Sequence, residues 1–407
     1  MAGGVYVLDF KEEMIGVRMD RLDESHRQVT AEVTVRTTLP GIPPHLHQAR
    51  LNLTSTAARK TLSKALTERL HLDWDALLEY ACVLVLQAYR QGEPVVRAGS
   101  LPRSPDGVAY RLWPLLRQSE PAVLYGYGGT GKSYMAVLSC LLVQRGVSAG
   151  GLNGHPEPVP ALYLDYESSP EEVNERVQWL RTGLMMPGDV DIFYRYSYHP
   201  LVDDLPEIQR IVADEKVGFL VVDSLGLACG GDPEHSDSAL HYFAALRSLR
   251  LTSLTIHHQP KDSLRGAFGS IYIENMARNV WELKGQQEQD SNTLHIGLYH
   301  KKVNRGKLLR PMGLRLLFDD TGESTKVQSM DILSVPQLAA GASLRTRIHD
   351  LLLHSAGMTV KDLAETLGER GEQQIRNVLS SHKEEFVNIT PGAKQSTWGV
   401  RTAGGVV

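Results

Sequence analysis

Short apolar runs alternate with helical patterns through the middle of the chain, and this alternation restricts the possible fold more than any other feature. Strands that alternate with helices and read as continuous apolar runs are typical of a parallel sheet covered on both faces. We therefore predict an α/β fold with a mainly parallel sheet. The strand-like runs are "PAVLY", "ALYLDYE", "DIFYRY", "VGFLVVDS" and "LTSLTIHH", with helical patterns at 133–145, 170–183, 204–215 and 237–250.

The pattern changes after this region. The segments "ARNVWELKG", "SNTLHIGLYHKK" and "LRLLFDD" follow one another without long helices between them. Strands joined by short connections pair antiparallel, because a parallel pair needs a long crossover. We expect these segments to extend the sheet in antiparallel fashion, within one α/β domain at residues 96–335.

Two smaller units flank this domain. Residues 1–95 combine strand-like runs with two helical patterns, the second with Asp73 as its N-cap, and predict a small α+β domain. Residues 343–407 contain three short amphipathic helices and then two strand-like runs around a Pro-Gly turn, which is typical of a winged-helix domain. Residues 91–118 and 336–342 are expected to be linkers.

Composition narrows the class of protein. A chain of 407 residues with 42% hydrophobic and 22% charged residues is ordinary for a soluble protein. Its net charge of -4 gives no global attraction to nucleic acid or acidic lipid, so any anion site must be local. No apolar run approaches the ~20 residues of a membrane span, and no signal peptide is recognisable. Three separated cysteines predict buried thiols in a cytoplasmic protein.

The stretch "YGYGGTGKSY" at 125–134 matches G-x-x-x-x-G-K-[ST], with a strand-like run before it and a helical pattern after it. Glycines let successive backbone N–H groups point at phosphate oxygens, and the helix N-terminus adds its dipole. The alternative is a glycine-rich turn with an incidental Gly-Lys-Ser. The predicted ATP-binding residues are Gly126, Gly128, Gly129, Thr130, Gly131, Lys132, Ser133 and Tyr134.

Residues with defined chemistry accompany this loop. We expect Lys132 to reach the β- and γ-phosphates and Ser133 to ligate Mg²⁺. Asp223 ends the apolar run "GFLVVD", so it is the predicted second Mg²⁺ ligand, although a strand-end aspartate can also cap a turn. Of Asp165 and Glu167, Glu167 is the candidate general base, because it lies further toward the carboxyl end of its strand.

The order of these features resembles the RecA-like ATPases, most closely the RepA/DnaB-type hexameric helicase branch, over residues 110 to 320. The loop is followed by "LDYE", "VVDS", a strand ending in "HH", "ARNVWEL" and "HKKVNRG". The resemblance implies that Glu167 is the catalytic glutamate and Asp223 the Walker B aspartate. It also implies that His258 is the sensor that couples the γ-phosphate to DNA-binding loops.

The resemblance further implies a homo-oligomer, with a hexamer as one form, in which a cation reaches the neighbouring subunit's γ-phosphate. Arg305 is the first candidate for this arginine finger and Lys302 the second. The family's Lys-x-Arg spacing is Lys302-x-x-Arg305 here. Lys261 and Arg265, in the loop after the "HH" strand, are candidates for contact with single-stranded DNA; a solvated flexible loop is the alternative.

Three functions are compatible with these features. The first is an ATP-driven motor on single-stranded DNA, a RepA-like replicative helicase of a plasmid, phage or mobile element. The second is a RecA-like ATPase switch, a regulator or loader whose winged helix binds DNA or a protein. The third is a small-molecule kinase, which the appended helical module disfavours.

Overall fold

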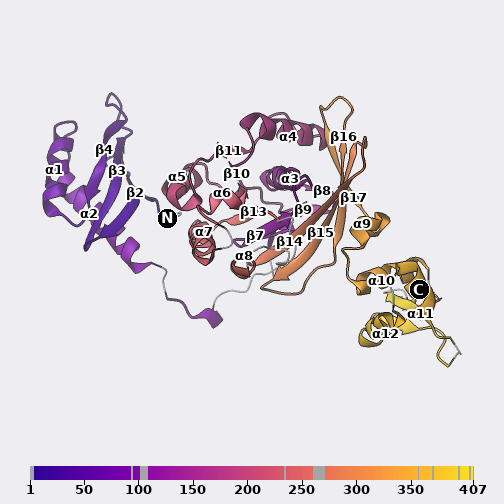
Figure 1. Cartoon of the computed structure of the whole chain (residues 1–407). Coiled ribbons are helices and arrows are strands. Elements are labelled where there is room, and N and C mark those ends of the chain that lie inside the picture. The colour runs from indigo at the N-terminus through magenta and orange to yellow at the C-terminus, as the bar shows by residue number, and fades with distance from the viewer. Residues whose placement is uncertain are drawn as a thin grey trace.

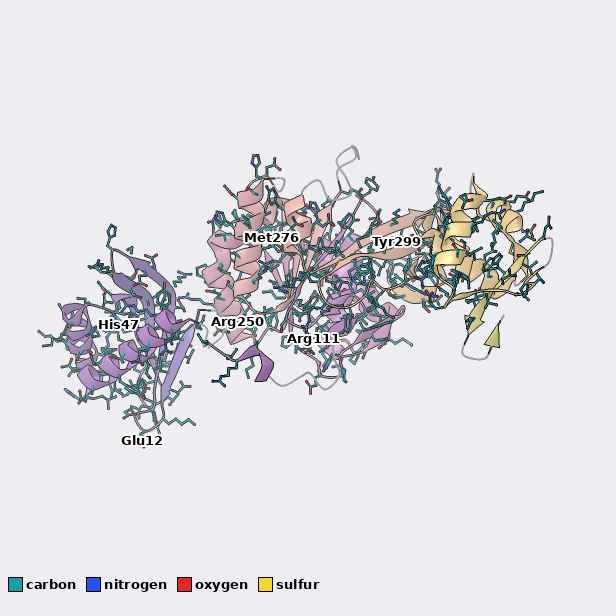
Figure 2. The ribbon with its side chains drawn as sticks, turned by 90° about the horizontal axis from the view of Figure 1, so that it is seen from below. Glu12, His47, Arg111, Arg250, Met276 and Tyr299 are labelled. Atoms are coloured by element: carbon teal, nitrogen blue, oxygen red, sulfur yellow. The ribbon has the colours of Figure 1, made fainter. Side chains whose placement is uncertain are left out.

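The computed structural model describes residues 4–92, 95–100, 109–232, 235–259, 271–355, 357–368, 371–392, 395–402 and 405–406 (Figure 1). The structure has three units, which lie in a row in the order of the sequence, with the largest in the centre (Figure 2). In the described part of the chain, no helix combines the length and the apolar character that crossing a bilayer requires.

The central unit is built on a nine-stranded sheet with the order β11-β10-β12-β13-β7-β14-β15-β16-β17. The first six strands of this order, from β11 to β14, run parallel to one another. Each of the last three, β15, β16 and β17, pairs antiparallel with the strand before it in the order. This parallel-rich sheet fits the predicted RecA-like core. The strands are β7 (Pro121–Gly126), β10 (Ala161–Asp165), β11 (Phe193–Tyr196), β12 (Phe219–Asp223), β13 (Thr252–His258), β14 (Asn279–Gln287), β15 (Thr293–Val303), β16 (Met312–Phe318) and β17 (Thr325–Met330).

Helices cover both faces of this sheet, as the continuous apolar strands require. Helices α3 and α4 bury apolar side chains against one face, and α5, α7 and α8 do so against the other. Helix α3 is buried on almost every side, because the sheet and α4 enclose it. The helices are α3 (Lys132–Arg145), α4 (Pro170–Gly183), α5 (Leu201–Asp214), α6 (Leu225–Ala228), α7 (Ser236–Ser248) and α8 (Ile271–Met276).

The antiparallel extension begins one strand later than expected. The segment "ARNVWELKG" forms β14, which is parallel to β7, and the antiparallel pairing starts between β14 and β15. The chain between β13 and β14 is long enough for a crossover and includes helix α8, so a parallel strand is possible there.

The linker predicted at 91–118 is also partly wrong. Strands β5 (Tyr110–Trp113) and β6 (Leu116–Arg117) form a small sheet with β9 (Leu152–Gly154) and β8 (Ser148–Ala149). Leu112, Leu115 and Leu116 are buried in the same apolar cluster as α3, which is why this stretch is ordered structure. A short 3-10 helix, η1 (Ala98–Ser100), precedes it.

The N-terminal unit is a four-stranded antiparallel sheet with two helices packed on one face. Asp73 caps the second helix, as predicted: its side chain accepts a hydrogen bond from the backbone N–H of Ala76. The elements are β1 (Tyr6–Phe10), β2 (Ile15–Ser25), β3 (Gln28–Thr37), β4 (His45–Asn52), α1 (Thr56–Thr67) and α2 (Trp74–Gln91).

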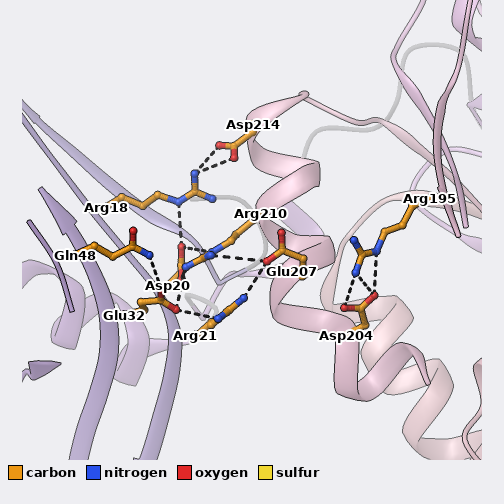
Figure 3. A network of polar contacts seen from close by, with 10 residues as sticks. All are labelled: Arg18, Asp20, Arg21, Glu32, Gln48, Arg195, Asp204, Glu207, Arg210 and Asp214. Carbon is orange, nitrogen blue, oxygen red and sulfur yellow. Dashed lines mark hydrogen bonds and ion pairs between the residues drawn. The ribbon is translucent and has the colours of Figure 1, made fainter. Parts of the chain in front are cut away.

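An ionic network joins the other face of this sheet to α5 (Figure 3). The Asp20 carboxylate, almost fully buried, accepts hydrogen bonds from Arg210 at 2.6 and 2.8 Å and from Arg18 at 3.0 Å. Arg18 also binds Asp214 at 2.7 Å, and Arg21 binds Glu207 at 3.0 Å. The N-terminal unit is therefore held to the central unit by paired charges.

The C-terminal unit has its own apolar cluster, formed by three helices and a small antiparallel sheet. The predicted linker at 336–342 contains a short helix, because Leu338 packs against Tyr299 and Ile332. The elements after β17 are η3 (Ile332–Ser334), α9 (Pro336–Ala339), α10 (Leu344–His354), β18 (Met358–Thr359), α11 (Val360–Leu367), α12 (Glu372–Ser381), β19 (Phe386–Asn388), β20 (Thr397–Thr402) and β21 (Gly405–Val406).

Candidate nucleotide site

The glycine loop and the predicted residues Glu167, Asp223 and His258 lie at the edge of the sheet where the parallel strands end. Asp165 and Asp223 are register partners on β10 and β12, and His258 on β13 is the partner of Gly126 on β7. Ligands of open α/β sheets bind at this carboxyl edge. The sheet topology therefore brings together residues that lie far apart in the sequence.

The glycine loop connects β7 to α3. Gly129 and Gly131 have positive φ values of 74° and 94°, which other residues rarely adopt. A Cβ on Gly126 would lie 2.3 Å from the carbonyl oxygen of Leu283, and a Cβ on Gly285 would lie 2.4 Å from that of Thr130. Strand β14 thus packs directly against the loop, and Gly285 is a supporting residue that the sequence analysis missed. A glycine inside a strand was the available signal.

The side chain of Lys132 turns back into the glycine loop that precedes it. Its side chain is 4% exposed, and Nζ donates hydrogen bonds to the carbonyl oxygens of Gly126 at 3.0 Å and Tyr127 at 2.6 Å. Burial lowers the pKa of Lys132, while Asp223 and Glu167 act in the opposite direction. The loop is closed further by Thr130, whose hydroxyl donates to the Tyr127 carbonyl at 2.8 Å.

Asp223 is the most deeply buried carboxylate among the predicted catalytic residues, with 2% of its surface exposed. Burial raises its pKa, and hydrogen bonds from the hydroxyls of Tyr163 and Ser133 counteract this. The Tyr163 hydroxyl donates to Oδ2 at 2.6 Å. Since hydroxyl and carboxylate oxygens suit Mg²⁺, Ser133 and Asp223 form a fitting pair of ligands.

Glu167 lies beside Asp223 and has two hydrogen-bonding partners. Its Oε1 accepts a hydrogen bond from the Ser224 hydroxyl, and its Oε2 lies 2.9 Å from Nε2 of His258. The hydrogen bond with His258 is the largest cause of a lowered Glu167 pKa. The nearest oxygen and nitrogen atoms of Glu167, Asp223 and His258 lie within 4.8 Å of one another.

Asp165 has a different environment from Glu167. Its Oδ1 accepts hydrogen bonds from the backbone N–H groups of Glu167 at 3.0 Å and Ser168 at 2.9 Å. Its Oδ2 accepts from the Tyr194 hydroxyl at 2.9 Å. Asp165 is therefore occupied in holding the segment that positions Glu167.

Tyr134, the last residue of the predicted nucleotide-binding set, has its side chain packed against the apolar interior of the central unit. Its ring packs edge-on against Phe318 at 5.4 Å, and the Arg176 guanidinium lies 5.8 Å from the ring centre. This side chain fills the space between α3, α4 and β16, which leaves only its backbone at the loop.

Arg305 lies at the opposite edge of the sheet. Its side chain is 65% exposed, and Nη1 lies 3.6 Å from Oε1 of Glu120, the residue before β7. The six residues of β7 place the glycine loop of the same chain roughly 20 Å away. Arg305 therefore cannot reach its own Lys132.

Lys302, the second candidate for the finger, is held within its own chain. Its Nζ donates hydrogen bonds to the carbonyl oxygens of Glu274, Asn275 and Ala277 at the end of α8. The predicted DNA contacts Lys261 and Arg265 lie outside the described residues.

Two residues whose hydroxyls bind site carboxylates, Tyr163 and Ser224, were not predicted from the sequence. Tyr163 was indistinguishable from a core aromatic on an apolar strand, because its hydroxyl partner is sixty positions away. Ser224 carried a weak signal, since it directly follows Asp223. Only the pairing of β10 with β12 reveals what either hydroxyl binds.

Comparisons with known proteins bear on this site. Residues 88–263 match a family model described as an AAA domain, a span that includes the loop, Glu167, Asp223 and His258. No curated protein matches the chain. Among solved structures, a KaiC-like protein from the hyperthermophilic archaeon Pyrococcus horikoshii is similar at 17% identity and a TM-score of 0.35. The similarity covers 57% of this chain and 99% of that one.

The AAA-domain match and the parallel-rich sheet together support a RecA-like P-loop ATPase. Nucleotide binding, usually with Mg²⁺, follows from that class, and the paired oxygens of Ser133 and Asp223 agree with it.

Proposed function

We propose that the chain is an ATP-hydrolysing motor acting on single-stranded DNA, in the manner of a RepA-like replicative helicase of a plasmid, phage or mobile element. The supporting observation is the contact of Glu167 with His258 beside Asp223. A candidate base thereby lies next to the metal-binding carboxylate and is joined to the strand that leads into the predicted DNA-binding loop.

In this proposal, the backbone N–H groups of the loop bind the phosphates, and Lys132 exchanges its carbonyl partners for the β- and γ-phosphate oxygens. Ser133 and Asp223 would hold Mg²⁺, which would supply positive charge to neutralise the phosphates. Glu167 orients the attacking water and accepts its proton, which a low pKa permits at neutral pH.

His258 couples this reaction to DNA. It binds Glu167 and ends β13, shortly before the segment predicted to bind DNA through Lys261 and Arg265. We propose that these two cations contact phosphates of the single strand. A change at the γ-phosphate would then move Glu167 and His258 and alter the loop's hold on DNA.

Hydrolysis in this proposal requires an oligomer. Arg305 is too far from its own nucleotide site but is exposed, so it can serve a neighbouring subunit as an arginine finger. We propose a homo-oligomeric ring, with separate domains at residues 1–95, 96–335 and 343–407, the last a winged helix.

The alternative is a RecA-like ATPase switch, a regulator or loader without unwinding activity. One observation favours it: on α12, the third helix of the proposed winged helix, Arg376 binds Glu372 at 2.6 Å. A cation already paired on its own helix is less available to DNA phosphates. A strand-displacement assay separates the two functions, because a switch hydrolyses ATP without displacing a strand.

The ATPase rate of the full chain with and without single-stranded DNA tests the motor. We expect stimulation by the DNA and loss of hydrolysis in Lys132→Ala. Equal rates with and without DNA would contradict the motor and favour the switch, and an active Lys132→Ala variant would contradict the nucleotide site itself.

A further inference from the structure

The loop that carries Arg305, residues 304–311, is fixed by contacts with other segments. At its start, the backbone N–H of Asn304 donates to the carbonyl oxygen of Arg278 at 3.0 Å. Toward its end, the backbone N–H of Leu309 donates to Nδ1 of His300 at 3.0 Å. These contacts hold the loop to the edge of the central sheet.

His300 is suited to accept this hydrogen bond. Burial lowers its pKa to about 4, so the ring is neutral near pH 7 and one nitrogen has a free lone pair. The other nitrogen, Nε2, lies 2.8 Å from Oδ1 of Asn279, and the ring stacks on Trp281 at 4.3 Å. His300, which anchors the loop to the central unit, is therefore held rigidly.

A second contact anchors the loop to the C-terminal unit. Arg310, five residues after Arg305, donates a hydrogen bond from Nη2 to Oε1 of Glu385 at 2.7 Å. The Glu385 side chain is 10% exposed, whereas that of Arg310 is 62% exposed. A part-buried carboxylate of one unit thus holds an exposed arginine of the other.

Glu385 is itself held in place from its own unit. Arg345 donates from Nε to Oε2 of Glu385 at 2.5 Å, and Nε2 of His349 lies 3.5 Å from Oε1. Both partners are on α10. Charge-assisted hydrogen bonds are shorter and stronger than neutral ones, and Glu385 binds Arg345 and Arg310 through its two oxygens, so the position of α10 is transmitted to Arg310.

We propose that Glu385 is a positioning residue for Arg305: through Arg310, the C-terminal unit sets where the finger loop projects toward the neighbouring subunit. The inference rests on the proposed function, because it requires Arg305 to act in trans. It adds a role for the C-terminal unit that is independent of whether that unit binds DNA or protein.

The test compares Glu385→Ala and Arg310→Ala with the control Glu384→Ala in the full chain. Glu384 is 68% exposed, with its Oε1 3.3 Å from Nδ1 of His382 and 3.8 Å from Nη2 of Arg345, and it does not contact Arg310 among the described residues. We expect the first two variants to lower kcat for ATP on the order of tenfold, since a misplaced group can cost that much, with KM unchanged. The double variant should be no slower than either single variant, and the control should keep the parental rate.

A mixing experiment distinguishes positioning from a general defect. Glu385→Ala subunits have an intact nucleotide site, and Lys132→Ala subunits have an intact finger loop. Mixed oligomers should therefore hydrolyse ATP faster than the sum of the two separate variants. Additive rates in mixed oligomers confirmed by sizing would overturn the inference.

Two further measurements distinguish failure of the proposed arginine finger from failure of the positioning role. If Arg305→Ala keeps full activity, the finger of the proposed function is wrong; if it loses activity while Arg310→Ala does not, only the positioning role is wrong. Should Glu385→Ala unfold the C-terminal unit in thermal melts, Arg310→Ala decides alone, because Glu385 keeps Arg345 and His349 in that variant.

Discussion

The two edges of the central sheet differ in how their charged side chains are held. At the carboxyl edge, Lys132 and Asp223 are buried and hydrogen-bonded within the chain. At the opposite edge, Arg305 is mostly exposed, and its Nη1 lies 3.6 Å from Oε1 of Glu120. One edge carries buried, paired charges, and the other presents a cation outward. In the proposed function, this difference means that the groups needed for fast hydrolysis are divided between subunits.

The strongest test of this difference removes the exposed cation. We expect Arg305→Ala to lower the ATPase rate about 10³-fold, the lower range for an arginine finger, while ATP affinity stays unchanged. The control is Lys307→Ala in the same loop, which should keep its activity. Mixing Arg305→Ala with Lys132→Ala subunits should restore hydrolysis; absence of restoration in mixed oligomers would argue against action in trans.

The next test removes the candidate base at the buried edge. Glu167→Gln keeps the size of the side chain but cannot accept a proton, so we expect the rate to fall about 10²-fold with ATP binding intact. Steady-state kinetics and binding of a fluorescent ATP analogue measure the two effects. Glu175→Gln, an exposed change on α4, is the matched control. A fully active Glu167→Gln variant would remove Glu167 from the reaction.

A smaller effect is expected on the pH dependence of the ATPase rate. The hydrogen bond with His258 keeps the pKa of Glu167 below its usual value, so the carboxylate stays ionised, and the enzyme active, to lower pH. His258→Ala should raise this pKa, and activity should then be lost at a higher pH as the solution is acidified. His258→Gln, which retains a donor, should shift the acidic limb of the pH–rate profile less. Identical acidic limbs for the three proteins would show that the contact does not tune Glu167.

The smallest expected effect is on the affinity for Mg²⁺. Tyr163→Phe removes a hydroxyl that lowers the pKa of Asp223, against the increase caused by burial. The same hydroxyl holds the Asp223 carboxylate in place at 2.6 Å. Loss of about 1 kcal/mol of this positioning should raise the Mg²⁺ concentration for half-maximal ATPase about fivefold. Titration with MgCl₂ at fixed ATP measures it. An unchanged midpoint would mean that Tyr163 serves packing alone.

The core elements were predictable because their signals are local. The strands at 121–125, 161–167, 217–224 and 251–258 show in continuous apolar runs, and the helices between them in their periodicity. The glycine loop was recognisable because its motif, preceding strand and following helix are contiguous. By contrast, β5 and β6 were read as a linker, because four- and two-residue strands carry too little pattern.

The candidate site was predictable only in part. Strand ends marked Asp223, Glu167 and His258, since polar residues after apolar runs stand out. Tyr163 and Gly285 were not recognisable, because the roles of both depend on a neighbouring strand in the sheet. The surroundings of the Tyr134 ring were not recognisable for the same reason: Phe318 and Arg176, which contact it, are distant in sequence.

The sequence by itself determined where strands and helices form and which residues can bind phosphate and metal, because periodicity, capping and the glycine loop act over a few positions. Only the tertiary structure decided that Arg305 faces away from Lys132, that Glu385 holds Arg310, and that Asp20 pairs with Arg210 across 190 positions. Paired charges carry no signal of their partner in the sequence, and strand order alone brings them within hydrogen-bonding distance.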